Sequence, residues 1–480
     1  MTDVVFALDV EDVVHPESDD ALLALCRIFT EEEVPLSLFV AGEKARTLRR
    51  RGRQDVITAM GRHEICYHGN YWGEFPEPAL VYGSRLGFDE AVKLALSIEL
   101  PGLHDVAEIT SQFPVAWCCH QAQQAPPLSY AYKLAGVRCW AGGPRGWIMN
   151  WLSWPRSNCA IDMQGSWSEL ADPARRDRPK PPCDPVADLL AVQAGFERTV
   201  ANHDFVSFLG HPVCWVASHW ALDEWTVLFR HGVAGAYPRP ASFRPAKLRS
   251  PEDRAAAMEL TRLILRWVKT RSDANLTSYT ALCARDEEDP RLWLTWEQVV
   301  DLARQALERF SYQAAQGTTF SCADVTGVLL FAVQYLWDTG SWPQRVPVQR
   351  LLGPTEAPLN VGKPLAFARE DLIAGSLAAY AVMMDERRLP GKLKARFVDV
   401  GPAELRYALA RFVVQAAETG ELPLQVEVPA LPMLPDCVHE PAITERRFGS
   451  SHRPADWTPD HLWDMLKWQS WSYRPVAREA

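Results

Sequence analysis

The N-terminal part of the chain alternates short apolar runs with longer segments of helical period. Residues 4–8 form an apolar run of strand length, residues 19–30 repeat apolar side chains at helical spacing, and residues 34–40 form a second apolar run. A helix at about 43–60 and a strand that begins near residue 64 continue the alternation. Strands that are apolar on both faces and alternate with helices are typical of a parallel sheet covered by helices.

Carboxylates and histidines follow several of these strands. Asp9, Glu11 and Asp12 end the first strand, His68 lies just beyond the third, and His211 ends a late strand. In α/β sheets the carboxyl ends of the parallel strands form the edge where ligands bind. We therefore expect these side chains to meet at one end of the sheet. The alternative is that the acidic residues serve only as a turn and a helix cap.

The second part of the chain is mostly of helical period and contains a repeat. The composition shifts to Pro, Arg and Ser at 235–251, so we expect a domain over residues 1–240 and another over 241–435. Helices of about four turns are each followed by an acidic residue, a turn, an apolar residue, a proline and a strand-like tail, at 338–348, 385–395 and 418–428. Residues 294–316 are a candidate earlier copy. Such units stack on their neighbours, which predicts a helical repeat domain.

The role of this domain stays open between two interpretations. The repeats loosely resemble those of cell-wall-binding modules, a resemblance that does not indicate a ligand. The alternative is a packing and docking domain, which would also be a candidate surface for homo-oligomer formation. Residues 436–480 carry Trp463, Trp468 and Trp471 at helical spacing. This spacing predicts an amphipathic tail that packs back on the body of the protein.

Charge, hydropathy and cysteine usage limit the partners and the compartment. The net charge is -10 and no basic run is large enough for a patch, so we expect no nucleic-acid partner. The densest basic cluster, at 44–53, is predicted to lie on a solvated helix end. We expect no membrane span and no signal peptide. Eleven scattered cysteines favour reduced thiols, and together these features predict a cytoplasmic protein.

Three segments, in order, resemble the motifs of the polysaccharide deacetylase family, carbohydrate esterase family 4. Residues 8–13 (Leu-Asp-Val-Glu-Asp-Val) resemble the first motif in the branch with an Asp-Val-Glu-Asp signature. Residues 62–69 (Arg-His-Glu-Ile-Cys-Tyr-His-Gly) resemble the second motif, and 209–212 (Leu-Gly-His-Pro) the last. The resemblance covers about residues 1–235. It implies a distorted (β/α) barrel of the deacetylase type, here followed by the mainly α-helical repeat domain.

The resemblance also implies roles for individual residues. Asp9 falls on the general base and His211 on the general acid. Glu11 and His68 fall on ligands of a divalent metal, which we expect to be zinc. Asp162 falls where the family places an acid that tunes the catalytic histidine. A metal of this kind polarises an acetamide carbonyl and lowers the pKa of a bound water, while the base takes its proton.

Two positions depart from the family pattern. Trp72 stands where a second metal histidine is expected, and Trp-Cys-Cys-His at 117–120 stands where an arginine normally orients the base. We therefore predict His120 as a replacement ligand. The other candidate ligands are Asp12, His15 and Glu74. The competing explanation is that the metal has been lost.

The remaining candidates concern substrate contacts and an alternative nucleophile. Asp12, Trp72 and Trp215 are predicted to contact substrate, with Trp72 as a stacking wall. Cys118 or Cys119 could act as a thiol nucleophile, but adjacent residues of a strand face opposite sides, so only one could reach the site.

Two hypotheses about function follow. The first is a hydrolase of non-peptide C–N bonds, most simply a metal-dependent N-deacetylase of an acetamido sugar or a related small amide. The second is a catalytically degenerate barrel that binds carbohydrate, with the helical repeats as an interaction module. Asp9, Glu11, His68 and His211 favour the first hypothesis. Trp72 and the missing arginine favour the second.

Overall fold

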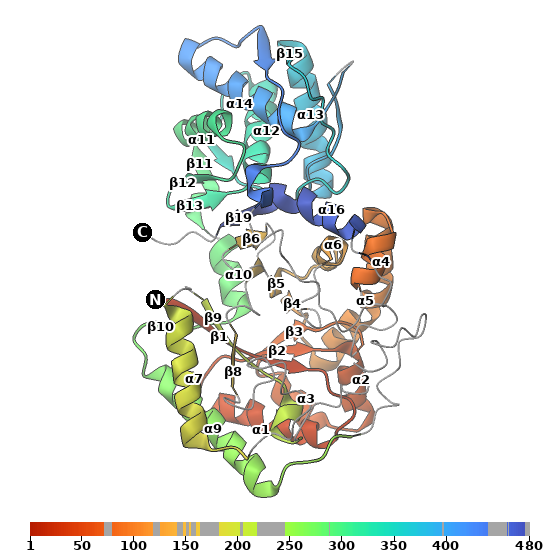
Figure 1. The fold of residues 1–480 in the computed structure, drawn as a ribbon, viewed down its shortest axis with the longest axis vertical. Coiled ribbons are helices and arrows are strands. Elements are labelled where there is room, and N and C mark those ends of the chain that lie inside the picture. Colours follow the sequence, from red (N-terminus) through yellow and green to blue (C-terminus); the bar gives the residue numbers. More distant parts are fainter. Residues whose placement is uncertain are drawn as a thin grey trace. The chain divides into compact units, whose positions relative to one another are not determined.

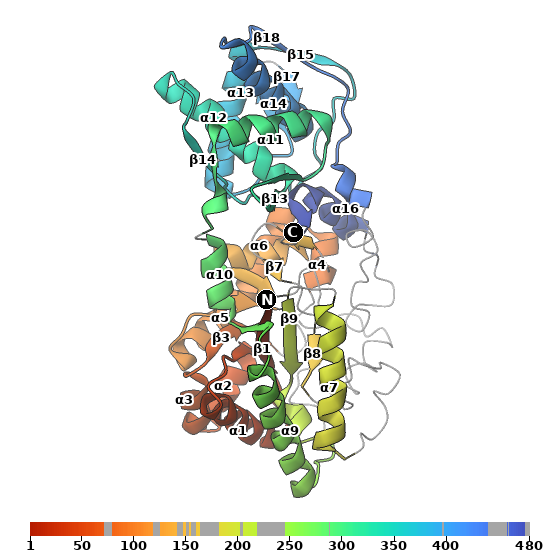
Figure 2. The same cartoon turned by 90° about the vertical axis from the view of Figure 1, so that its left-hand side faces the viewer.

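A computed structural model covers the 480-residue chain. It describes residues 1–71, 79–118, 125–141, 147–149, 153–154, 160–163, 182–201, 205–217, 245–287, 289–395, 398–439, 458 and 460–475. Side chains are not described at 147–149, 153–154, 160–162, 286–287 and 460. The chain divides into two compact units (Figures 1 and 2). Unit 1 comprises residues 1–145, 154–286 and 447–459, and unit 2 comprises residues 146–153, 287–446 and 460–480.

The elements of the first unit alternate between strands and helices, as the apolar pattern predicts. In chain order they are β1 (Thr2–Val10), α1 (Glu17–Glu31), β2 (Ser37–Val40), α2 (Gly42–Arg50), α3 (Gln54–Met60), β3 (Glu64–Tyr67), α4 (Ala79–Arg85), α5 (Phe88–Thr110), β4 (Ala116–Trp117), α6 (Pro126–Leu134), β5 (Cys139–Ala141), β7 (Ser153–Trp154), β8 (Ala160–Asp162), α7 (Pro185–Val200), β9 (Phe205–Gly210), the 3-10 helix η4 (Pro212–Trp215), α9 (Pro251–Lys269), β10 (Ala274–Leu276) and α10 (Tyr279–Glu287).

These strands form one sheet in the order β7-β5-β4-β3-β2-β1-β9-β8, with β10 also paired to β1. Successive strands β1 to β5 are parallel neighbours, and the late strand β9 returns to pair in parallel with β1. The helices contact one another in the matching order α6-α5-α2-α3-α1-α9-α7. A doubly wound sheet would split its helices between two faces. The continuous helix layer instead confirms the predicted distorted (β/α) barrel.

The first strand lies at the centre of the sheet because its residues 4–8 are apolar and buried. Val4, Val5 and Leu8 have no exposed surface, and Phe6 stacks on Phe208 of β9 with ring centroids 4.6 Å apart. On one side β9 pairs with Asp3–Leu8. On the other side β10 pairs with the first part of the strand and β2 with the last part. The backbone of a buried strand needs hydrogen-bond partners along both edges, and β10 supplies part of one edge.

The two compact units divide at a different residue from the composition shift, and the expected domain bounds stay a prediction. The composition shift indicated a boundary near residue 240, whereas the first compact unit continues to Asp286. Ser250 caps α9, with Pro251 at its first position, so the Pro-rich segment begins a helix of the barrel. Residues 440–457, 459 and 476–480 of the expected tail domain lie outside the described residues.

The basic cluster at 44–53 is not simply a solvated helix end. The ammonium of Lys44 is buried, where it donates to Asp19 at 2.5 Å and to the carbonyl oxygen of Asp12 at 2.5 Å. Arg51 donates to the other oxygen of Asp19 at 2.9 Å and to the carbonyl oxygen of Val13 at 2.7 Å. Both cations therefore hold the acidic loop after β1 against α1 and α2.

The second unit contains the elements that the repeat predicts. They are β6 (Trp147–Met149), η6 (Pro290–Leu292), β11 (Trp293–Thr295), α11 (Trp296–Glu308), β12 (Gln313–Ala315), β13 (Thr318–Phe320), α12 (Cys322–Thr339), β14 (Arg345–Pro347), β15 (Leu365–Ala368), α13 (Arg369–Glu386), β16 (Leu393–Ala395), β17 (Val398–Val400), α14 (Pro402–Thr419), β18 (Gln425–Val428), η7 (Asp436–His439), α16 (Asp460–Trp468), η8 (Gln469–Ser472) and β19 (Tyr473–Pro475).

Strand pairing shows that the repeating unit contains two helices. Antiparallel pairs β12–β13 and β11–β14 join the two β-α-β segments around α11 and α12, and β16–β17 with β15–β18 join those around α13 and α14 in the same way. Gly340, Arg387 and Gly420 end three of the helices in the left-handed conformation. The fully buried Trp471 packs in the hydrophobic core of this unit, with its ring centroid 5.1 Å from that of Phe310. None of the helices in the described ranges is long and apolar enough to cross a membrane.

Lys44→Met tests the anchoring of the acidic loop. The substitution leaves the buried Asp19 with Arg51 alone, so we expect the free energy of unfolding to fall by about 3 kcal/mol, the lower end for breaking a buried ion pair. Urea denaturation followed by far-ultraviolet circular dichroism measures the change. Lys93→Met, at an exposed position of α5, is the matched control and should change stability by less than about 0.5 kcal/mol. Equal stabilities of the two variants would contradict this role of Lys44.

Candidate functional site

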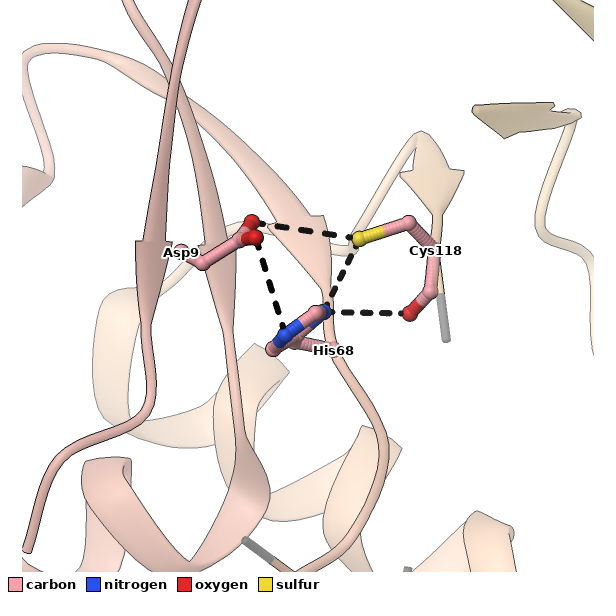
Figure 3. A group of neighbouring side chains, drawn as sticks. All are labelled: Asp9, His68 and Cys118. Carbon is pink, nitrogen blue, oxygen red and sulfur yellow. Dashed lines mark hydrogen bonds and ion pairs between the residues drawn. The ribbon is translucent and has the colours of Figure 1, made fainter. Parts of the chain in front are cut away.

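Five side chains from four strands meet at the carboxyl end of the sheet. They are Asp9 and Glu11 at the end of β1, His68 after β3, Cys118 after β4 and His211 after β9, and we call them the acid–imidazole cluster. Figure 3 shows three of them, Asp9, His68 and Cys118. The sequence prediction that the first, third and last strands bring their polar residues together thus agrees with the observed distances.

Strand register explains how residues so distant in sequence become neighbours. Val10, Val40, Tyr67 and Trp117 lie side by side across four parallel strands. The next residue of three of these strands is Glu11, His68 or Cys118. Leu8 pairs with Gly210, which brings His211 beside Asp9 in the same way. Because the strands are parallel, each one delivers its first residue beyond the sheet to the same edge.

The shortest distances within the cluster define two carboxylate–imidazole pairs, Glu11 with His68 and Asp9 with His211. The Nε2 atom of His68 lies 3.1 Å from Oε2 of Glu11 and 3.9 Å from Oδ2 of Asp9. The Nε2 atom of His211 lies 3.3 Å from Oδ2 of Asp9 and 3.8 Å from Oε1 of Glu11. Each carboxylate therefore faces both imidazoles.

Both ring nitrogens of His68 face acceptors. Its Nδ1 atom lies 2.9 Å from the sulfur and 3.2 Å from the carbonyl oxygen of Cys118, and its Nε2 atom faces Glu11. A neutral imidazole would direct a lone pair at one of these groups. Because a thiol can donate its S–H group, a ring with one proton on Nε2 can accept from Cys118, and a second proton or a metal ion at Nδ1 requires Cys118 to act as the acceptor. Burial opposes the charge, but Cys118, Asp9 and Glu11 outweigh it and raise the pKa of His68 well above its ordinary value of 6.5.

The exposed fractions show on which side the cluster is accessible. The side chains of Asp9, Glu11 and His68 are 8%, 4% and 3% exposed, whereas that of His211 is 21% exposed. A molecule from solvent would therefore reach His211 first. Gly210 directly precedes His211 in the chain. The buried Trp215 packs so closely against Gly210 that a Cβ atom on this glycine would lie 2.5 Å from the indole.

Backbone hydrogen bonds hold the loop that carries His68. Gly69 has a φ of +90°, which a residue with a side chain would adopt only under strain. The N–H groups of Gly42 and Glu43, at the start of α2, donate to the carbonyl oxygens of Gly69 and Asn70 at 2.9 and 2.8 Å. Gly102 of α5 allows a close approach, because a Cβ atom there would lie 2.5 Å from the side chain of Asn70.

Glu99 of α5 supports the same loop through its carboxylate. It accepts hydrogen bonds from the backbone N–H of Asn70 at 2.9 Å and from the hydroxyl of Tyr67 at 3.1 Å. Tyr132 also hydrogen-bonds this carboxylate. Burial of the carboxylate outweighs these bonds and raises the pKa of Glu99 above 4.5. Glu99 was not identified from the sequence, where it reads as one polar residue of an amphipathic helix.

The donor set of the cluster fits a divalent metal. Asp9, His68 and Cys118 each offer one ligand atom, and these atoms lie within 4.8 Å of one another. All three residues are buried. A carboxylate oxygen, an imidazole nitrogen and a thiolate sulfur are ligands that zinc accepts together. The sequence missed Cys118 as a ligand because a cysteine in a strand usually packs as a small apolar residue, and only its place at the strand end could have revealed it.

The other residues predicted from the sequence differ in their surroundings. The carboxylate of Asp12 accepts hydrogen bonds from the N–H groups of Val14 and His15 and lies 3.2 Å from Nδ1 of His15. The indole N–H of the fully buried Trp215 donates to the hydroxyl of Thr261 at 3.0 Å. The substrate contacts expected of Asp12 and Trp215 stay predictions.

Three further predicted residues, and one alternative, fall where the structure gives no side chain. Trp72, His120 and the alternative ligand Glu74 lie outside the described residues. Asp162 ends β8, and its backbone pairs with Leu209 of β9, two residues before His211. Its side chain is outside the described part, so its tuning role is a prediction as before.

Comparison with known proteins gives a likeness of fold only. No protein-family model and no curated protein matches the sequence. Among solved structures, a probable polysaccharide deacetylase from Pseudomonas aeruginosa has 12% identity and a TM-score of 0.37, over 60% of this chain and 92% of that chain. A family 4 acetyl xylan esterase from Clostridium thermocellum has 13% identity and a TM-score of 0.32, over 59% and 90%. A family 4 pseudoenzyme from Bacillus anthracis has 13% identity and a TM-score of 0.28, over 44% and 55%.

Glu99→Gln gives a pH-dependent prediction for the loop support. Because the pKa of Glu99 is raised in the folded state, the folded protein binds more protons than the unfolded protein in the range above pH 4.5. The wild type therefore loses stability as pH rises through this range, whereas glutamine does not titrate. We expect the melting temperature of Glu99→Gln, relative to wild type, to rise between pH 4.5 and neutrality. Glu90→Gln, at an exposed position of α5, is the control, and a difference that does not vary with pH would contradict the prediction.

Proposed function

We propose that this protein is a hydrolase of non-peptide C–N bonds, most simply an N-deacetylase of an acetamido sugar or a related small amide, dependent on a divalent metal such as zinc. The observation that carries the proposal is the meeting of two carboxylates, two imidazoles and a thiol at the carboxyl ends of β1, β3, β4 and β9. Such a cluster supplies both a proton acceptor and a proton donor to one bound molecule.

The residues divide the proton transfers of amide hydrolysis between them. A carboxylate of the Asp9–Glu11 pair takes a proton from the attacking water, and the motif resemblance assigns this role to Asp9. His211 gives a proton to the departing amine, for which its position at the accessible side of the cluster is suitable. A metal held with His68 would lower the pKa of the water and polarise the acyl carbonyl. The products are a carboxylic acid and an amine.

A second candidate function is carbohydrate binding without turnover, and burial is the observation that favours it. Asp9 and Glu11 are 8% and 4% exposed, so little of the acidic pair is accessible to a bound molecule. In that case His68 keeps its second proton and no metal is needed to balance the carboxylates. The helical repeats would then serve as an interaction module.

Metal analysis separates these two functions. Protein purified without chelators should contain about one equivalent of zinc or a similar ion if the hydrolase proposal is correct, and dialysis against a chelator should remove both metal and acetate release. A wild type that contains no metal, releases no acetate from acetylated sugars and still binds them by calorimetry would support the binding function instead.

Asp9→Asn and His211→Ala test the proton transfers. We expect each substitution to lower acetate release by at least about 100-fold, because each removes a group that accepts or donates a proton. The melting temperatures should stay close to that of the wild type. His104→Ala, at an exposed position of α5, is the matched histidine control and should retain full activity. Full activity of His211→Ala would contradict its role as the acid.

A further inference from the structure

We propose that Cys118 is a metal ligand and that its thiolate completes a zinc site with Nδ1 of His68 and the carboxylate of Asp9. This inference rests on the proposed metal-dependent function and names the ligands of that site. It also changes two of the roles implied by the motif resemblance, because it puts Asp9 on the metal and Glu11 beside it.

The position of the sulfur is the first support. Cys118 is the first residue after β4, and its N–H donates to the carbonyl oxygen of Tyr67 at 3.0 Å, which holds the backbone at the strand end. Its sulfur lies 2.9 Å from Nδ1 of His68 and 3.9 Å from Oδ1 of Asp9. Two ligand atoms of tetrahedral zinc, with bonds of about 2.0 to 2.3 Å, lie roughly 3.5 Å apart, so zinc binding would move the sulfur and Nδ1 apart by roughly half an ångström.

The orientation of His68 is the second support. Its Nδ1 atom faces the sulfur, whereas its Nε2 atom lies 3.1 Å from Glu11. Histidines that bind metal through one nitrogen usually donate the other N–H to a carboxylate or a carbonyl group. Glu11 is the nearer of the two carboxylates to Nε2, and the contact is an ion pair in which Glu11 would accept the Nε2 proton once Nδ1 holds the metal. Glu11 is thus a positioning residue for His68 in this site.

The surroundings of Cys118 differ from those of an ordinary core cysteine. Burial raises the pKa of the Cys26 thiol in α1 to about 12, which keeps that residue in its neutral form. Cys118 is equally buried but faces an imidazole and a carboxylate instead of apolar groups. A set of thiolate, imidazole and carboxylate selects zinc over magnesium, calcium or manganese, which prefer oxygen ligands.

X-ray absorption at the zinc edge of the zinc-loaded, full-length wild type tests the inference without any variant. We expect one sulfur neighbour at about 2.3 Å together with nitrogen and oxygen neighbours. Zinc bound by nitrogen and oxygen alone would overturn the role of Cys118 while leaving the proposed hydrolase intact. Sulfur-bound zinc without acetate release would support the site and count against the hydrolase. Failure of the wild type to bind zinc would overturn both.

Cobalt substitution gives a second readout in which variants can be compared. The cobalt-loaded wild type should show a sulfur-to-cobalt charge-transfer band in the near ultraviolet. Cys118→Ser should lose the band and weaken zinc binding by more than about tenfold, whereas Cys26→Ala should retain both. Glu11→Gln should keep the band with zinc affinity lowered about 10- to 100-fold, as expected for a group that orients a ligand. A band that survives in Cys118→Ser would overturn the inference.

Discussion

The buried carboxylates of Asp9 and Glu11 must be balanced by positive charge, and this requirement governs the chemistry of the site. Removing a carboxylate from water costs several kcal/mol unless opposite charge and hydrogen bonds compensate it. The imidazoles of His68 and His211 lie against the two acids, at 3.1 to 3.9 Å. Cys118, Asp9 and Glu11 raise the pKa of His68, so this ring can balance the carboxylates as a cation, and a metal ion could take the place of its proton.

The scaffold around the cluster limits how far these charges can move apart. Lys44 and Arg51 fix the loop after β1 through Asp19. Glu99 and the start of α2 fix the loop after β3 through Asn70. Both loops are therefore attached to helices of the barrel by polar contacts that are mostly buried. A site held in this way is preorganised, so the cost of bringing like charges together is met during folding.

The local apolar pattern predicted the parallel sheet with its helices, and the motif resemblance implied the barrel, whereas features that depend on tertiary neighbours were missed. The apolar run 4–8 and the carboxylates after it show both the central strand and its functional end. By contrast, β10 is a three-residue strand, Ala274–Leu276, that gains its identity only from pairing with β1. Lys44 looked solvated because it begins a basic run, although its buried partner Asp19 is 25 residues away.

The candidate site was predictable to a similar extent. Asp9, Glu11, His68 and His211 were identified because ordered motifs place them at strand ends, whereas Cys118 and Glu99 act through neighbours that the sequence does not show together. The repeats behaved in the same way. Their turns were visible in the sequence, but the pairing of β11 with β14 and of β15 with β18, which makes two helices one unit, depends on long-range contacts.

The nature of the cation on His68 decides between catalysis and binding. A second proton on the His68 ring balances the charge of the carboxylates as a metal ion would. Both ring nitrogens then interact with protein groups, Nε2 with Glu11 and Nδ1 with Cys118. Such a ring has no position left at which to polarise an acyl oxygen. A zinc ion at Nδ1 would balance the same charges and also keep a coordination position for water or substrate. The partly exposed imidazole of His211 could then exchange a proton with the water or substrate bound there. Under the proposed function, the same folded scaffold would support hydrolysis with the metal and only charge balance without it.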